Sequence, residues 1–500
     1  MTDLLINNKI IKNTLLFIIL AEILSFLGYY WQIINFITFF AIIIITIILA
    51  LRRLGYGLYI LLTELLIGSF GYLFYFENGG LKISLRIALW LIIMSVWLAK
   101  AVIKLVKTKK LELNFFRSPY LFYFLALFLF IALGVISGFL HNNSLNNIFF
   151  DFNNWLYFLL VFPIFSVWQN DNNLKIIKQI FLASIGWLSL KTIILAYIFS
   201  HSFNYFILDL YLWVRRSGVG EITQVVPGFS RIFMQSHIFV LIGFFILLFY
   251  LLKNLNEKPA ALNKQNFYLI GFNALLLSTI IISFSRSFWL GLAAGGLFIC
   301  LIAIFKLKIS LKKFIVFNLM IISTIILSLA LTFFIIKFPY PAPSGDFNAT
   351  NLLSDRATQA TNEAGASSRW QLLPPLWQKI KLGPILGQGF GATVTYKSSD
   401  PRVLAVNSTG EYTTYAFEWG WLDVWLKLGV LGLLAYLILF AKIIYNTLKI
   451  NSYFSLSLAA GLVIILAVNI FSPYVNHPLG IGYLIMAAAI IENLKIQNNF

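Results

Sequence analysis

Glu418 stands where a carboxylate could do chemistry. It follows Tyr412 and Tyr415 and precedes Trp419, at the start of a long apolar stretch. Aromatic rings suit both stacking on sugars and a place at the membrane interface. Burial beside these rings would favour the protonated acid, whereas neighbouring arginines would favour the carboxylate. We expect Glu418 to be a catalytic general base; the alternative is an acid that stabilises the first turn of a helix.

Several arginines lie close to apolar segments. Arg286 occupies a tight turn, in IISFSRSFWLGLAAGG, between two apolar runs. Arg215, Arg216 and Arg231 share the polar segment RRSGVGEITQVVPGFSRIF. A guanidinium group matches phosphate oxygens in a two-pronged geometry, and charges close to hydrocarbon usually face a cavity and mark function. We expect a positive rim for a polyanion at the external membrane face; a snorkelling arginine and an ordinary solvated loop are the alternatives.

The polar stretch 337–414 is the longest break between apolar runs, and it includes SSRWQLLPPLWQKIKLGPILGQGFG. Pro374 and Pro375 suit the start of a helix, because a proline in the first turn loses no needed hydrogen bond. Gly383-Pro384 would end this helix. Its tryptophans and lysines predict that it lies along the membrane interface.

Three glycines follow this predicted helix. A phosphate-binding loop would need a strand–turn–helix unit around them, which the sequence does not provide. We therefore predict a tight turn beneath the helix, formed by Gly387, Gly389 and Gly391.

The composition is that of an integral membrane protein. Of the 500 residues, 60% are hydrophobic and 11% are charged, whereas about 25% are charged in soluble globular proteins. One cysteine and four scattered histidines offer no disulfide framework and no metal cluster, so we expect no metal and no other cofactor. The net charge of +19 comes without a basic patch interleaved with aromatic residues outside the apolar runs, so we expect no nucleic-acid partner.

The apolar runs predict an all-α, polytopic bundle of about 12–14 transmembrane helices in a lipid bilayer. The predicted spans are 14–31, 33–51, 54–76, 83–103, 119–140, 149–168, 177–200, 232–252, 267–283, 287–305, 314–336, 415–441, 453–471 and 478–493.

Basic residues in the short loops concentrate on one side, which the positive-inside rule makes cytoplasmic. The N- and C-termini are then cytoplasmic, and a short segment near 201–231 is external. We expect about eleven helices in 1–336, a large external, periplasmic loop with short interfacial helices in 337–414, and two or three helices in 415–500.

Ionisable residues also occur within the predicted spans. Glu22, Glu64 and Lys191 could pair with each other as structural contacts or form a proton relay. Asp423 and Lys427 are four residues apart, a spacing typical of an ion pair on one helix face.

The order of these features resembles the O-antigen ligase and O-antigen polymerase superfamily of bacterial envelope polysaccharide assembly. The resemblance rests on the RRSG segment, the SFSRSFWLGL turn, the SSRWQLLPPLWQKIKLGPILGQGFG stretch and EWGWLDVWLKLGVLGLLAYL, and FSPYVNHPLGIG adds to it. Motif similarity covers about Trp213 to Gly482, and the hydropathy pattern covers the whole chain. The resemblance implies a GT-C-like membrane fold.

The resemblance also implies an activity. A glycan would move from an undecaprenyl diphosphate carrier to a hydroxyl of an acceptor glycan or glycolipid, without a metal and with inversion, at the external face of the bacterial inner membrane. The residues that would hold the diphosphate are Arg215 or its neighbour Arg216, Arg286 and Arg369. The residues that would contact the sugar or the acceptor are Tyr412, Tyr415 and Trp419.

One position departs from the pattern of the ligases. In those proteins a histidine stands eleven positions before a GxxG motif; here GxxG spans Gly429 to Gly432, and Glu418 occupies the histidine position. A carboxylate can still accept the proton of a hydroxyl, and a diphosphate leaving group needs charge stabilisation more than protonation. The departure favours a polymerase, which joins lipid-linked repeat units, or a ligase-like enzyme with a different acceptor, over a ligase of the usual kind.

Two other classes stay open on the sequence. One is a transporter of a small anion such as bicarbonate, with Glu22, Glu64 and Lys191 as its active groups and the external loop as a lid. The other is a noncatalytic assembly partner. The concentration of arginines and aromatic residues on one face favours the glycosyltransferase.

Overall fold

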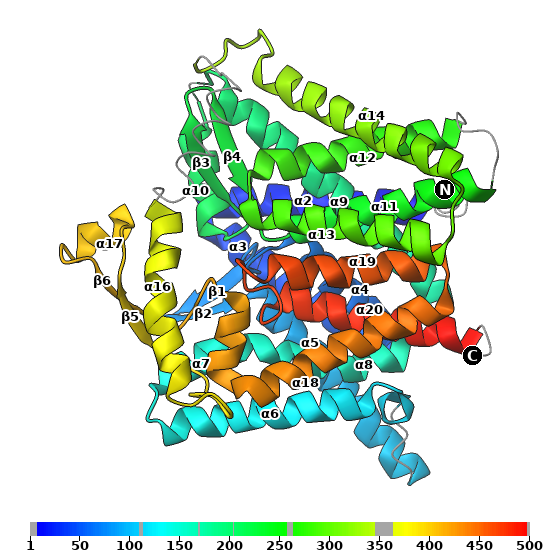
Figure 1. Cartoon of the computed structure of the whole chain (residues 1–500). Helices are drawn as coiled ribbons and strands as arrows, with labels where there is room; N and C mark the ends of the chain where they lie inside the picture. Colours follow the sequence, from blue (N-terminus) through cyan, green and yellow to red (C-terminus); the bar gives the residue numbers. More distant parts are fainter. Residues whose placement is uncertain are drawn as a thin grey trace.

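The chain folds as a bundle of long, roughly parallel helices, seen in a computed structural model that describes residues 8–109, 114–168, 171–203, 205–257, 264–345 and 364–497 (Figure 1). Within these residues, twelve helical segments are long and apolar enough to cross a membrane, and two further apolar helices are shorter. The prediction of an all-α polytopic bundle is therefore confirmed.

The long segments are α2 (Asn8–Tyr30), α3 (Gln32–Arg52), α5 (Leu85–Thr108), α6 (Leu121–Leu140), the consecutive α7 (Leu145–Phe152), η2 (Asn153–Leu160) and α8 (Val161–Val167), α9 (Asp171–Ser200), α11 (His237–Glu257), α12 (Lys264–Ser283), α13 (Arg286–Leu301) with η3 (Ile302–Lys306), α14 (Leu311–Ile336), α18 (Gly420–Ile450) and α20 (Pro478–Gln497). The short apolar helices are α4 (Leu54–Ile67) and α19 (Tyr453–Val468).

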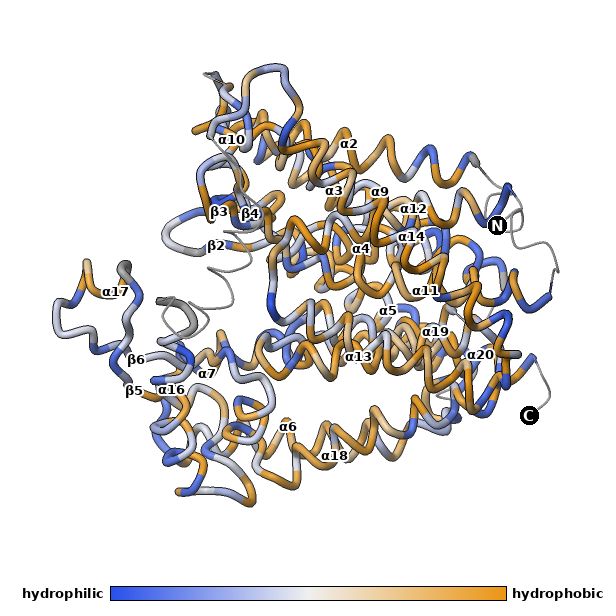
Figure 2. Tube along the Cα trace, turned by 45° about the horizontal axis from the view of Figure 1, so that its top comes forward, coloured by the Kyte–Doolittle hydropathy of each residue, from blue (hydrophilic) through white to orange (hydrophobic). Residues whose placement is uncertain are grey.

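Burial divides these helices into inner and outer ones. Most residues of α11, α19 and α20 are buried, whereas α2, α3, α5 and α14 keep many large apolar side chains exposed. An apolar side chain exposed on a membrane-spanning helix meets lipid rather than water. Figure 2 shows hydrophobic residues along the helices and hydrophilic ones gathered towards their ends.

One end of the bundle carries a layer of short elements, which we call the end layer. Both described chain ends lie at the opposite end (Figure 1). The end layer consists of α10 (Ile207–Arg216), α16 (Ala364–Lys381), α17 (Pro401–Val406) and three antiparallel hairpins, β1 (Tyr75–Asn78) with β2 (Leu81–Ser84), β3 (Glu221–Val226) with β4 (Phe229–Phe233), and β5 (Val394–Lys397) with β6 (Glu411–Thr414).

The β1–β2 hairpin corrects one predicted span. The sequence predicted a helix over 54–76, but α4 ends at Ile67 and strand β1 begins at Tyr75. Asn78 pairs with Leu81 across Gly79 and Gly80, whose φ angles are 56° and 85°. Two consecutive positive φ angles fit the tight hairpin turns that match strand twist, and glycine adopts them without strain.

Helix α16 corrects the predicted helix start. The helix begins at Ala364, ten residues before Pro374, so both prolines lie inside it. Prolines in a helix interior remove backbone hydrogen bonds, but here an apolar face continues past them. Leu372, Leu376 and Ile380 are buried with Phe417 and Leu426 in one cluster. Packing of this face therefore outweighs the local cost of the prolines. The predicted stop near Gly383 is confirmed.

The glycines after α16 form a loop that enters a break in α18. Gly429 interrupts α18 with φ 69° and ψ 176°, and the N–H of Val430 donates to the carbonyl of Pro384 at 2.9 Å. A Cβ on Gly429 would lie 2.0 Å from the carbonyl oxygen of Ile385, and one on Gly389 would lie 2.0 Å from the backbone nitrogen of Gly138. These glycines serve close backbone approach, so the predicted tight turn is confirmed.

Candidate functional site

A polar cavity of about 390 Å³ opens among the end layer and the adjoining helix ends. We call it the arginine cavity. It is lined by Glu221, Arg231, Phe233, Gln235, Phe284, Ser285, Arg286, Ser287, Arg369, Glu418, Phe471, Ser472, Pro473, Tyr474 and His477. Its charged lining is three arginines against two glutamates, so an anionic group entering the cavity would be attracted.

Arg286 is the first residue of α13, and Phe284 to Ser287 line the cavity. The N-terminus of α13 therefore lies at the cavity wall, where a helix end favours anions. The Ser287 hydroxyl lies 3.0 Å from that of Ser285 and accepts a hydrogen bond of 3.0 Å from Ser472. These bonds fix the turn that carries Arg286 against the loop 469–477.

Arg231 comes from strand β4 and is held from two sides. Its Nε donates to the carbonyl of Ser283 at 2.9 Å, and its guanidinium lies 4.9 Å from the centre of the Phe233 ring. Both contacts orient the guanidinium while the side chain stays partly exposed. The hairpin β3–β4 thus brings Arg231 to the cavity beside the turn of Arg286.

Arg369 and Glu418 form an ion pair at the cavity. The Nε of Arg369 donates to Oε2 of Glu418, with side-chain exposures of 34% and 51%. The indole N–H of Trp419 donates to the carbonyl of Arg369 at 2.9 Å, and its ring lies 5.2 Å from that of Trp370. Helix α16 and the segment before α18, about fifty positions apart in sequence, are joined here.

The structure separates the remaining predicted residues from this cavity lining. Arg215 and Arg216 are exposed at the end of α10, 5.7 Å from the ring of Tyr211 and 5.4 Å from that of Tyr29, respectively. Trp419 lies beside the cavity, since its ring is 5.2 Å from that of the lining residue Phe471.

The two predicted tyrosines lie near Glu418 in the chain but are not among the lining residues. Tyr412 is in β6, where its ring lies 6.0 Å from that of Tyr396. Tyr415 is half-buried, and burial, followed by the charge of Asp151, raises its pKa. Their roles as sugar or acceptor contacts stay predictions.

Three titratable lining residues, Glu221, Tyr474 and His477, had no role predicted from the sequence. His477 ends the loop 469–477, which follows α19 and reaches the cavity with Phe471 and Tyr474. Burial, with a smaller effect of the Arg86 charge, lowers the pKa of His477 to about 3, so the ring is neutral at physiological pH. The signal for it was a polar break, SPYVNH, between two strongly apolar helices.

A buried ionic network lies where the end layer meets the membrane helices. Lys427 Nζ lies 2.6 Å from Asp423 on the same helix, which confirms the predicted pair, and 2.5 Å from Asp151 of α7. Asp151 also accepts from the N–H of Gly391 at 2.9 Å, and Asn476 donates to Asp423. The network therefore joins α18, α7, the glycine loop and the loop that ends in His477.

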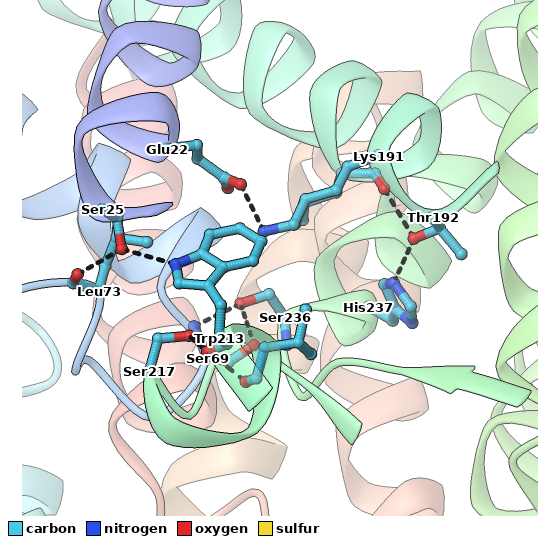
Figure 3. Close-up of polar contacts among 12 residues, drawn as sticks. Glu22, Ser25, Ser69, Leu73, Lys191, Thr192, Trp213, Ser217, Ser236 and His237 are labelled. Atoms are coloured by element: carbon cyan, nitrogen blue, oxygen red, sulfur yellow. Dashed lines mark hydrogen bonds and ion pairs between the residues drawn. The ribbon is translucent and has the colours of Figure 1, made fainter. Parts of the chain in front are cut away.

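The acids inside the predicted spans are paired. Glu22 of α2 and Lys191 of α9 lie 2.6 Å apart, with 6% of each side chain exposed. Figure 3 shows this pair beside Trp213 of α10; the Lys191 nitrogen is 5.0 Å from the ring centre. Glu64 forms two hydrogen bonds of 3.0 Å with Arg86 of α5, a partner that sequence analysis did not name.

Within the described residues, no group of three or more His, Cys, Asp or Glu side chains is arranged to hold a metal ion. Metal independence of any reaction stays a prediction.

The fold and the site define a multi-pass membrane protein with a cationic cavity at one end of its helices. Residues 271–437 match the family model described as O-antigen ligase. The match supports a relation of this chain to the O-antigen ligase and polymerase superfamily. It also supports a general role in glycan assembly in a bacterial membrane. The match includes Arg286, Arg369 and Glu418, whereas Arg231 and His477 lie outside it. Searches of curated proteins and of solved structures find no match to the chain.

Proposed function

We propose that the protein is a glycosyltransferase of polysaccharide assembly that uses an undecaprenyl diphosphate-linked glycan, as a polymerase rather than a ligase, at the external face of the bacterial inner membrane. The observation that carries the proposal is the convergence of Arg231, Arg286 and Arg369 on one cavity at a helix-bundle end. A diphosphate that is anchored by a polyprenyl chain would hold its charges at the end of the helix bundle. The chain itself would stay in the hydrocarbon layer that the apolar helices cross.

The arginines would stabilise the leaving group. As the bond between the anomeric carbon and the phosphate oxygen breaks, negative charge grows on the diphosphate. Arg231 is held by the Ser283 carbonyl and the Phe233 ring, and serine hydrogen bonds hold the turn that carries Arg286 at the N-terminus of α13, so little backbone reorganisation is needed. Arg369 would complete the diphosphate site from α16. The exposed Arg215 and Arg216 would act at longer range, attracting the anionic carrier to the end layer.

Glu418 would act as the base. Arg369 occupies its Oε2, so Oε1 is the atom offered to the hydroxyl of the acceptor glycan or glycolipid. The hydroxyl oxygen attacks the anomeric carbon, its proton passes to Glu418, and the diphosphate leaves on the opposite face of the sugar, which inverts the anomeric configuration. Trp419 would stack on a sugar ring close to this point, and Tyr412 and Tyr415 would contact the glycan that extends away from the cavity.

The transporter alternative draws less support from the geometry. A relay along Glu22, Lys191 and Glu64 needs groups that exchange partners, but Glu22 and Lys191 bind each other and Glu64 is held at two points by Arg86. Buried pairs of this kind are typical of contacts between helices.

Glycan-length analysis in the host tests the proposal. The gene is deleted and complemented with wild type, Arg286→Ala or Glu418→Ala, and the envelope and exported glycans are sized. Loss of long chains with accumulation of single lipid-linked repeats supports a polymerase, and long chains left on the carrier indicate a ligase. Unchanged glycans with the gene expressed would contradict both. Full activity of Glu418→Gln would exclude the base assignment.

A further inference from the structure

His477 lies in the arginine cavity although no step above uses it. Two contacts of the imidazole ring are seen in the structure. Its Nδ1 accepts a hydrogen bond of 3.3 Å from the N–H of Leu479, and its plane meets the Phe70 ring edge-on at 6.3 Å. These contacts set the orientation of the ring within the loop 469–477, which is itself tied to the turn of Arg286 by Ser472.

The hydrogen bond at Nδ1 determines which nitrogen carries the proton. A neutral imidazole has one N–H donor and one acceptor nitrogen, and a backbone N–H can be bound only by the acceptor. The proton is therefore on Nε2. In the described part of the chain, Nε2 has no hydrogen-bond partner, and the residue lines the cavity with Arg286 and Ser472.

We propose that His477 is a catalytic residue whose Nε2–H donates a hydrogen bond to a phosphate oxygen of the lipid-linked diphosphate in the arginine cavity. This inference rests on the proposed function and deepens it by adding a donor from outside the segment that matches the family model. A neutral donor binds the anion without adding a charge that would have to be neutralised in the empty site. The depressed pKa of His477 is consistent with this donor role and opposes a role as base.

The same geometry separates this role from that of Glu418. The ligases of the superfamily place a histidine at the position that Glu418 occupies here, and this chain brings a histidine into the cavity from a different loop. His477 does not replace the base, because its Nδ1 acceptor is taken by Leu479 and its Nε2 holds a proton. The carboxylate of Glu418 would accept the proton of the acceptor hydroxyl, and the imidazole of His477 would donate a hydrogen bond to the diphosphate.

Two amide substitutions separate the two nitrogens of the ring. In His477→Gln the side-chain amide N–H reaches the position of Nε2, so the donor is kept. In His477→Asn the shorter side chain reaches only the position of Nδ1, so the contact with the Leu479 N–H is kept and the donor is lost. His477→Leu removes both. Thermal unfolding of each purified full-length variant shows which of them fold.

The measurement is transfer from an undecaprenyl diphosphate-linked repeat by each variant in proteoliposomes, together with competition by farnesyl diphosphate and farnesyl monophosphate. We expect His477→Gln to stay within a few-fold of wild type. We expect His477→Asn to lose about ten- to a hundredfold in kcat and to bind farnesyl diphosphate less tightly, since hydrogen bonds to charged groups are worth about 1.5–3 kcal/mol.

Three outcomes overturn parts of the account in distinguishable ways. Wild-type activity in folded His477→Asn would reduce His477 to a loop contact and overturn the inference alone. A folded but inactive His477→Gln would show that an N–H donor at the position of Nε2 does not suffice, which also overturns it. Absence of transfer and of diphosphate binding in wild type would instead overturn the proposed function.

Discussion

Charged side chains occupy two contrasting regions of this protein. Inside the bundle the buried acids of the membrane helices have a partner within about one hydrogen-bond length. The partner is a cation in Glu22–Lys191, Glu64–Arg86 and Asp423–Lys427, and Glu492 accepts from the hydroxyl of Ser118. In the arginine cavity, arginines outnumber glutamates and the side chains are partly exposed. The inner charges are paired within the fold, whereas the cavity has positive charge to offer a ligand. The comparison assigns structure to the first region and substrate binding to the second.

Breaking the buried network should give the largest effect. Lys427→Met leaves Asp151 and Asp423 without their shared cation, and breaking a buried pair typically costs about 3–5 kcal/mol of unfolding free energy. We expect little folded protein in detergent, measured by size-exclusion chromatography and thermal unfolding. The triple substitution with Asp151→Asn and Asp423→Asn should recover much of the stability. A Lys427→Met protein as stable as wild type would show that the network does not hold the fold.

A smaller effect is expected on the pH dependence of folding stability, to which His477 contributes. Because the pKa of His477 falls from 6.5 to about 3 on folding, stability is full above pH 6.5 and declines as pH falls towards 3, where the unfolded chain binds a proton that the folded chain excludes. We expect a decline of about 1 kcal/mol per pH unit. His477→Gln, which does not titrate, should lose this component; parallel stability curves of the two proteins from pH 6.5 to 4.5 would contradict a lowered pKa of His477.

The smallest effect is expected from the exposed arginines of α10. Replacing Arg215 and Arg216 with alanine should raise KM a few-fold and leave kcat nearly intact, because steering acts on encounter rather than on the transition state. The effect should disappear at high salt, since charges in water are screened beyond about 8 Å at physiological ionic strength. A large loss of kcat would place these arginines with the cavity residues.

Sequence patterns predicted the apolar helices and part of the site. Hydrophobic runs of spanning length have few alternatives in a membrane, so most spans were recovered, and Arg286, Arg369 and Glu418 do meet in one cavity. The hairpins were missed because strands of four to six residues leave too short an alternation to detect. The start of α16 was misplaced because local proline preference was weighed without the apolar face that packs on Phe417.

Long-range pairing was beyond sequence reasoning. Asp151 and Lys427 are 276 positions apart, and Glu64 and Arg86 are joined only because α4 and α5 pack together. In the sequence His477 is one of four scattered histidines. It shares a cavity with Arg286 because the loop 469–477, which Ser472 links to Ser287, folds back to the turn of Arg286. No spacing rule connects such positions, since tertiary packing alone brings them into contact.

The most direct test of the central claim is transfer by purified protein in proteoliposomes, with an undecaprenyl diphosphate-linked repeat and EDTA present. Wild type should elongate the glycan, and Arg286→Ala should be about 10²–10³-fold slower in kcat, the usual loss when one preorganised donor to a developing anion is removed. Its unfolding temperature should match that of wild type, and Arg286→Lys should recover only part of the rate. An Arg286→Ala protein that elongates glycan at the wild-type rate would contradict the assignment of the arginine cavity as the diphosphate site.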